Sequence, residues 1–98
     1  MNIDAIANRS LSVALKRGKI SPYTDDKSLH LESLRGLCEE LAEFSAASET
    51  ARSEHLPAFS EAEEELADIA LVALTELSRR SISVEQLLLT KISFNENR

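Results

Sequence analysis

Residues that break helices are scarce in this chain, and their scarcity limits the fold more than any other feature of the sequence. Only two glycines and two prolines occur among 98 residues. Because these two residue types weaken a helix interior most, long stretches without them favour long helices. No stretch shows the strict alternation of apolar and polar residues that is typical of strands, so the sequence predicts an all-α fold.

The breaks that do occur divide the chain into four stretches. Gly18 and the Ser21-Pro22 pair end the first stretch, and Pro57 interrupts the chain before the third. Capping boxes, in which a serine and a Glu or Gln three residues later each satisfy a free backbone amide, open the third and fourth stretches at 60–63 and 83–86. The expected helices cover about 4–17, 28–51, 60–80 and 83 to near the C-terminus.

The length of the chain predicts a single domain that covers residues 1–98. Four such helices would form an up-down bundle, but a chain this short buries only about two-thirds of the surface of its unfolded form. A second copy would add apolar surface that one chain lacks. We therefore expect dimerisation to complete the core, in a homodimer or a dimer of dimers.

The charge balance argues against one class of partner. The formal net charge is −6, and the eleven Lys and Arg residues are scattered along the sequence. A nucleic-acid backbone needs a positive surface, so polymeric DNA or RNA is not an expected partner. The longest apolar run, 69–74, is short, and the N-terminal region lacks the features of a signal peptide. We therefore expect a cytoplasmic protein that does not insert into a membrane.

The second expected helix carries an apolar stripe with two carboxylates beside it. At about 100° per residue, this stripe should face the core. Glu40 and Glu43 lie on the adjoining strip together with Ala47, whose small side chain would let another helix come close. The stripe, which includes the only cysteine, consists of Leu31, Leu34, Leu37, Cys38, Leu41 and Phe44.

The third expected helix repeats this arrangement. Glu65 and Asp68 share a strip with Val72. Neither acid is followed four residues later by Lys or Arg, as is common on a solvated acidic face. The apolar stripe that should face the core consists of Leu66, Ile69, Ala70, Ala73, Leu74 and Leu77.

Two acid pairs on consecutive helices predict a metal site. Like charges three residues apart repel one another, and the repulsion grows when the charges are partly buried. A divalent cation would compensate it, and Mg²⁺ prefers carboxylate oxygens combined with water and phosphate oxygens. Glu39 could hold a water molecule or simply be solvated. The alternative is that both pairs lie on solvated faces, since Glu is a common helix former.

The fourth expected helix places polar groups where its apolar side should continue. Val84 and Leu88 lie on that side, and helical spacing then leads to Lys91, Asn95 and Arg98. Two cations and an amide that point the same way could bind phosphate oxygens. Alternatively, the cations only complement the dipole at the end of a helix.

Together these motifs resemble those of the MazG-like, all-α nucleoside triphosphate pyrophosphohydrolases. That family's pattern is EExxE, a spacer, ExxD and then KxxxNxxR. The chain has Glu39-Glu40-Leu41-Ala42-Glu43, then Glu65-Leu66-Ala67-Asp68, then Lys91-x-x-x-Asn95-x-x-Arg98. The resemblance spans about residues 28–98, although Arg79-Arg80-Ser81 stands where such proteins often have a glycine turn.

The resemblance implies a MazG-type fold and a reaction. The enzyme would hydrolyse a nucleoside triphosphate between its α- and β-phosphates to give the monophosphate and pyrophosphate. Mg²⁺, or Mn²⁺ in its place, would be held by Glu40, Glu43, Glu65 and Asp68. A carboxylate would accept the proton of the attacking water, and a cation would stabilise charge on the phosphates. The catalytic residues would be Glu39, Glu40 and Lys91, and the substrate-binding residues Lys91, Asn95 and Arg98.

Other residues with functional side chains have structural interpretations. His30 and His55 are expected at the surface, while Arg52 could reach a nucleotide across a dimer. An aromatic side chain that could stack on a base is more often a core residue. Core positions are therefore expected for Tyr23, Phe44, Phe59 and Phe94.

Two further classes of function remain compatible with the sequence. A helical module could keep this bundle to sense a nucleotide or bind a protein without turnover. A helical scaffold with merely solvated acids would not be stabilised by metal. The enzyme is the leading hypothesis, with a non-standard or surplus deoxynucleotide as one substrate that a house-cleaning hydrolase would remove.

Overall fold

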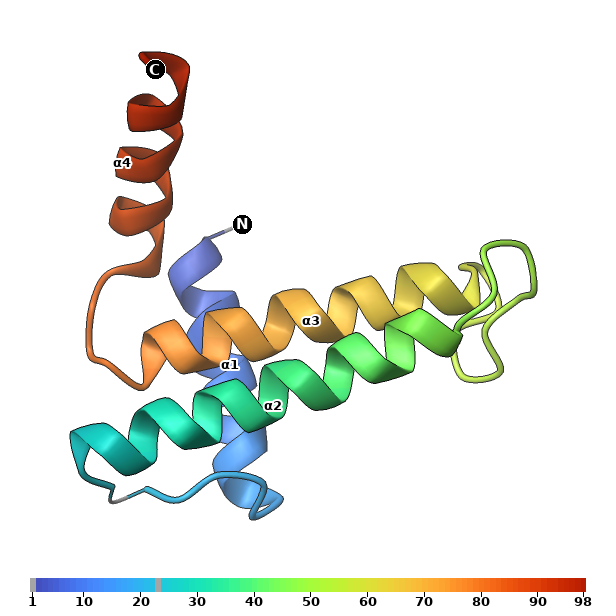
Figure 1. Ribbon diagram of the computed structural model, residues 1–98, viewed down its shortest axis with the longest axis horizontal. Helices are drawn as coiled ribbons and strands as arrows, with labels where there is room; N and C mark the ends of the chain where they lie inside the picture. Colours follow the sequence, from blue (N-terminus) through green and yellow to red (C-terminus); the bar gives the residue numbers. More distant parts are fainter. Residues whose placement is uncertain (1, 23) are drawn as a thin grey trace. The chain divides into compact units, whose positions relative to one another are not determined.

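The computed structural model describes residues 2–22 and 24–98. Within these ranges no strand forms, and the all-α prediction is confirmed. An isolated antiparallel bridge pairs Arg52 with Ser60. No helix in this part of the chain has the length and apolar composition that crossing a bilayer requires. The helices are α1 (Ile3–Lys16), α2 (Asp26–Ala46), α3 (Glu61–Ser78) and α4 (Val84–Glu96) (Figure 1).

Side-chain caps begin α3 and α4 where the sequence predicts them, whereas α2 begins at Asp26, two residues before the predicted start, with Asp25 as its cap. At α3 the capping box is confirmed, because the Ser60 amide donates to Glu63 Oε1 (2.7 Å) and the Glu63 amide donates to Ser60 Oγ (3.0 Å). At α4 the Gln86 amide donates to Ser83 Oγ (3.2 Å). The Gln86 side chain does not complete a second box but donates to Thr90 Oγ1 (3.5 Å).

The end of α2 differs from the prediction. The sequence predicts a helix to about Ala51, whereas α2 ends at Ala46. Ser48 Oγ accepts hydrogen bonds from the backbone amides of Thr50 (3.2 Å) and Ala51 (2.9 Å). Serine side chains that bond to nearby amides compete with helix formation, so residues 47–60 form a loop.

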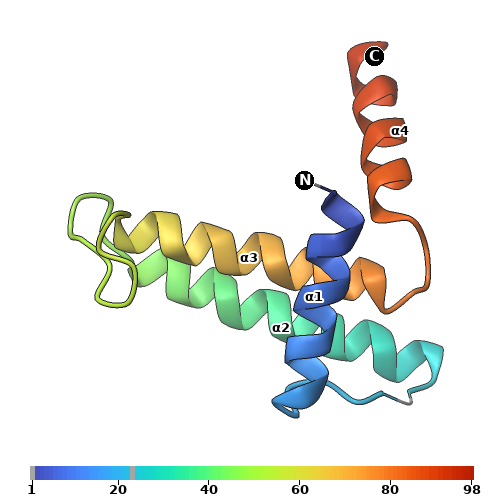
Figure 2. The same cartoon turned by 180° about the vertical axis from the view of Figure 1, so that it is seen from behind.

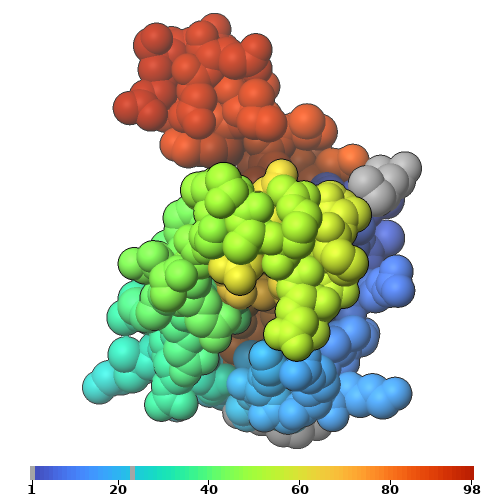
Figure 3. Space-filling model, turned by 90° about the vertical axis from the view of Figure 1, so that its right-hand side faces the viewer, coloured from blue at the N-terminus to red at the C-terminus, as the bar shows by residue number. Residues whose placement is uncertain are grey.

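The described residues form two units, which we treat separately. Unit 1 combines the described residues of Met1–Pro22 with Leu74–Arg98, and unit 2 comprises those of Tyr23–Ala73. In unit 2, α2 and the first part of α3 lie side by side and antiparallel (Figures 1 and 2). Figure 3 shows the loop that joins them, in yellow-green, from its outer end.

The loop 47–60 of unit 2 is closed by its own backbone. The Ser53 amide donates to the Phe59 carbonyl (2.9 Å), and the Glu61 amide donates to the Ala51 carbonyl (2.9 Å). Ser53 and Ser60 are each only 2% exposed. These contacts give the loop one defined conformation at the end of the helix pair.

In unit 1, α4 is attached to α1 through its first turn. Ala7 and Val84 are completely buried. Asp4 Oδ1 accepts the Val84 amide (2.6 Å), and Asp4 Oδ2 accepts Ser83 Oγ (3.1 Å). A carboxylate at this position satisfies amides that the helix leaves unpaired and complements its dipole.

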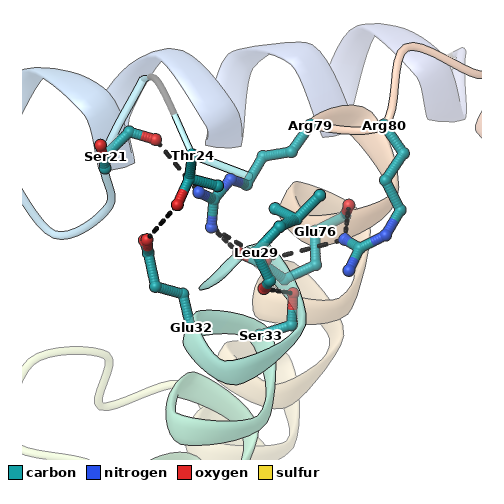
Figure 4. Close-up of polar contacts among 8 residues, drawn as sticks. All are labelled: Ser21, Thr24, Leu29, Glu32, Ser33, Glu76, Arg79 and Arg80. Carbon is teal, nitrogen blue, oxygen red and sulfur yellow. Dashed lines mark hydrogen bonds and ion pairs between the residues drawn. The ribbon is translucent and has the colours of Figure 1, made fainter. Parts of the chain in front are cut away.

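The turn between α3 and α4 is also well anchored (Figure 4). Arg79 Nη1 lies 3.0 Å from Glu76 Oε1, and Arg79 Nη2 donates to the Ser21 carbonyl (3.0 Å). Ser81 adopts a left-handed backbone conformation with φ 57°. Glycine adopts this conformation without strain, whereas a residue with a Cβ, such as Ser81, adopts it only at a steric cost.

The apolar stripes are only partly covered in the single chain: Leu37, Phe44 and Ile69 are half-buried, whereas other stripe residues are exposed. Leu31, Leu34 and Leu41 of α2 are 55%, 51% and 54% exposed, and Leu66 of α3 is 50% exposed. Cys38 is exposed as well. Periodicity identifies the apolar side of a helix, but not what covers it, and one layer of two helices leaves its outer apolar face open.

Candidate metal centre

The four predicted acids converge because the two strips that carry them face each other. Gly36 precedes Glu40 by one turn on α2, and Val72 follows Asp68 by one turn on α3. A Cβ built on Gly36 would stand 3.5 Å from Val72 Cγ1. The helices therefore meet closely one turn away from the acids.

The carboxylates form a compact group. Each of the four side chains offers one carboxylate oxygen, and these four oxygens all lie within 4.8 Å of one another. The four residues are Glu40, Glu43, Glu65 and Asp68. Glu43 is exposed, and the other three are half-buried. The prediction that these acids come together is confirmed.

The electrostatics of the group disfavour four negative charges. Burial, followed by repulsion from Glu43 and Asp68, raises the pKa of Glu40 from 4.5 to about 7. Burial, followed by repulsion from Asp68 and Glu43, also raises the pKa of Glu65. Both acids thus hold protons more tightly than free glutamate does, because their charged forms lack compensation.

Two oxygens of the group lack hydrogen-bond partners. Glu40 Oε2 and Glu65 Oε2 are buried and accept no hydrogen bond. A buried carboxylate oxygen without a donor is costly, whereas a bound cation would satisfy it. An all-oxygen donor set of carboxylates suits a hard divalent cation such as Mg²⁺ or Mn²⁺. The residues present therefore fit a metal ion.

Glu39 and the α4 residues are placed differently. Glu39 is exposed and stands outside the group of four. In unit 1, Lys91 Nζ lies 4.7 Å from the centre of the Phe94 ring, and the Arg98 guanidinium lies 5.9 Å from it. Arg98 Nη1 donates to Asn95 Oδ1 (3.5 Å). Lys91 and Asn95 lie on α4, whereas Arg98 lies beyond the end of the helix at Glu96, so the predicted helical line does not reach it. All three are exposed, and their role toward the acids stays a prediction.

A cavity of about 510 Å³ in unit 2 adjoins the acids and involves residues that the sequence did not single out. Its lining includes three of the four acids, Glu43, Glu65 and Asp68. It also includes Ser53 and His55 of the loop and Glu64 of α3. His55 is at the surface, as predicted, with its side chain 80% exposed. Its pairing with Glu64 depends on how the loop folds back, which periodicity does not reveal.

The expected core positions of the aromatic residues are only partly correct. Phe59 and Phe94 are 53% and 60% exposed, so the prediction is wrong for both. Phe44 is half-buried, and Tyr23 lies outside the described residues. Arg52 Nη1 donates to the Ala58 carbonyl (3.3 Å) within the loop.

No model of a protein family, no curated protein and no solved structure matches this chain. The chemistry of the site therefore has to be inferred from its own geometry. That geometry consists of four convergent carboxylates, two buried oxygens without partners and an adjoining cavity.

Proposed function

We propose that this protein is a Mg²⁺-dependent nucleotide pyrophosphohydrolase of the MazG-like type, which converts a (deoxy)nucleoside triphosphate to the monophosphate and pyrophosphate. The observation that carries the proposal is the convergence of four carboxylates from α2 and α3. The order of the three sequence motifs, which resembles that of the MazG-like enzymes, supports the same reaction.

The charge of the site explains why a triphosphate would need a cation there. A triphosphate is repelled by the group of four acids, so it binds only when positive charge lies between them. When bound, Mg²⁺ would neutralise the phosphates and lower the pKa of a water molecule. The residues that would hold it are Glu40, Glu43, Glu65 and Asp68.

The other predicted site residues would accept the proton of the attacking water and bind the phosphates. Glu39 is exposed beside Glu40 and is free of the group of four, so it can accept a proton from the attacking water. Lys91 and Arg98 would bind phosphate oxygens, with Arg98 in fork geometry. Asn95, which accepts a hydrogen bond from Arg98, would orient that guanidinium.

We also propose that a second copy covers the open apolar face of unit 2 in a MazG-type dimer. Leu31, Leu34 and Leu41 are each more than half exposed on one side of α2. Several large apolar side chains exposed on one side of a helix favour an interface there, and burying them would supply the core that one chain lacks. Light scattering should report at least a dimer, and Leu34→Glu should shift it toward the monomer.

The test of the enzyme is a product analysis. Purified protein is incubated with a panel of NTPs and dNTPs in Mg²⁺, and the products are separated by ion-exchange chromatography. Monophosphate and pyrophosphate should appear in equal amounts and should be absent with EDTA or in Asp68→Asn. Glu49→Gln, which removes one loop carboxylate outside the group of four, is the matched control and should remain active.

Three other results would reject the proposal. Release of orthophosphate alone would indicate cleavage of a different bond. Tight binding of an intact nucleotide would indicate a sensor. Neither turnover nor stabilisation by metal would indicate a scaffold with solvated acids.

A further inference from the structure

The cavity beside the acids has lining residues that the proposed reaction does not use. Besides three of the four acids, Ser53, His55 and Glu64 line it. Glu65 Oε2, one of the buried oxygens without a partner, belongs to a residue of the same lining. A ligand held at the acids through its phosphates would therefore have room for its remaining part in this cavity.

Glu64 is held in the lining of the cavity by two neighbours. Glu64 Oε1 accepts a hydrogen bond from Ser53 Oγ, and Glu64 Oε2 lies 3.5 Å from His55 Nδ1. Ser53 Oγ in turn accepts the Leu56 amide (2.9 Å), which ties it to the loop. A carboxylate has about four acceptor positions, so Glu64 can accept further hydrogen bonds in addition to these two contacts.

The chemistry of the lining favours a ligand that donates hydrogen bonds to it. Among the described residues, the lining contains several carboxylates and no Lys or Arg. Ala46 and Ala47 contribute an apolar wall, against which a flat ring can lie. Such a cavity accepts hydrogen bonds readily and repels carbonyl oxygens, so it suits a ring with amino groups on its edge.

We propose that this cavity binds the base of the nucleotide and that Glu64 accepts hydrogen bonds from its amino edge. Cytosine, adenine and guanine carry such an edge, whereas uracil and thymine present carbonyl oxygens in the corresponding positions. Ser53 and His55 are positioning residues that orient Glu64. The inference rests on the proposed function, because it places the phosphates at the four acids. The expected preference for amino-bearing bases is about ten- to hundredfold.

The experiment compares cytosine and uracil nucleotides, which have similar sizes and differ in this edge. For wild-type protein in Mg²⁺, kcat/KM for dCTP should exceed that for dUTP by at least about tenfold. Glu64→Gln can donate from its amide to a carbonyl oxygen, so the dCTP/dUTP ratio should fall toward one or reverse. Glu49→Gln, a loop substitution outside the lining, should leave the ratio unchanged.

Calorimetric binding of CMP and UMP measures the base preference of the cavity without turnover. Preferential binding of CMP that is lost in Glu64→Gln supports the inference, even if no triphosphate is hydrolysed and the proposed function fails. Hydrolysis of dCTP and dUTP with equal kcat/KM would overturn the inference and leave the proposed function standing. An unchanged dCTP/dUTP ratio in an active, folded Glu64→Gln variant would also overturn it.

Two variants test the positioning role of the loop side chains. Ser53→Ala and His55→Ala should reduce the dCTP/dUTP ratio mainly through KM for dCTP, with kcat nearly unchanged. Ser53→Thr keeps the hydroxyl and should restore the ratio. Equal losses for dCTP and dUTP would mean that these residues only stabilise the loop, and would reject the positioning role.

Discussion

Gly36 on α2 lies directly against Val72 on α3, such that a Cβ at position 36 would stand 3.5 Å from Val72 Cγ1. The same strips carry Glu40 and Asp68 one helical turn away. The distance between the two helices at this crossing therefore determines how close the carboxylates can come. A metal ion that bridges α2 and α3 requires that distance to be kept.

Enlarging residue 36 should weaken metal binding. In Gly36→Leu the side chain would meet Val72 and force the helices apart, at a cost of about 1–3 kcal/mol in stability. We expect the affinity for Mg²⁺, measured by calorimetry, to fall by at least about tenfold, since four ligands can no longer reach one ion. In Gly36→Ala the Cβ stands at an ordinary contact distance, and helix propensity improves by up to about 1 kcal/mol. An equal loss of affinity in both variants would contradict this explanation.

Removing one charge from the acidic group should stabilise the metal-free protein. Glu65→Gln relieves repulsion at a half-buried position, so its Tm in EDTA should rise by a few degrees. The same variant should lose most of the Tm increase that Mg²⁺ gives to the wild type. Differential scanning fluorimetry measures both effects, with Glu49→Gln as the control. A loss of helical circular dichroism would show that Glu65 has a structural role instead.

The stability of the metal-free protein should depend on pH through Glu40. Its pKa is raised from 4.5 to about 7, so the folded chain keeps a proton that the unfolded chain releases. The contribution of Glu40 to stability is present below about pH 4.5 and is lost as the pH rises through about 7. In EDTA, the Tm of the wild type should therefore fall across this window relative to Glu40→Gln. Parallel curves for the two proteins would refute the assignment.

The cations of α4 should contribute to triphosphate binding. Lys91→Ala and Arg98→Ala should each raise the Kd for a non-hydrolysable triphosphate several-fold, because each removes a charge that can contact phosphate oxygens. Both residues are exposed, so the helical content should stay unchanged. Lys27→Ala removes the same charge near the start of α2 and serves as the control. Unchanged affinity in both variants would mean that α4 only supports the fold.

Replacing Arg79 in the turn after α3 should destabilise the protein more than replacing Arg80. The Glu76 and Arg79 side chains are 9% and 6% exposed and lie 3.0 Å apart, so Arg79→Ala would leave a buried carboxylate poorly compensated. We expect a loss of about 3 kcal/mol in urea unfolding. The Arg80 side chain is 33% exposed and lies 3.8 Å from Glu76, so Arg80→Ala should cost about 1 kcal/mol or less. Equal losses would be the contrary result.

The sequence predicts features that depend on local spacing. The four helices, the serine caps at 60 and 83 and the pairing of acids follow from periodicities within one helix. The convergence of the acid pairs of α2 and α3 was predictable, because in each helix the two acids are three residues apart and lie beside an apolar stripe. Helical spacing also places Lys91 and Asn95 on one line of α4, but it does not predict that the helix ends at Glu96, before Arg98.

Features that depend on contacts between distant residues were not predictable in this way. A single glycine inside a helix, such as Gly36, has no meaning until its neighbour Val72 is known. The early end of α2 depends on the Ser48 hydroxyl, which competes with the helix. The pairing of His55 with Glu64 requires the loop to fold back on α3. The exposure of Leu34 depends on what packs against the chain, which periodicity does not specify.

The loop 47–60 is bonded to itself and to the first turns of α3. Its closure depends on bonds such as those between Ser53 and Phe59 and between Ala51 and Glu61, none of which involves the four acids. Loop exchange would therefore change Ser53 and His55, which orient Glu64, while Glu64 itself and the four acids would stay on the helices. Selectivity could then be tuned through the loop during evolution or in the laboratory without altering the groups that would hold the metal.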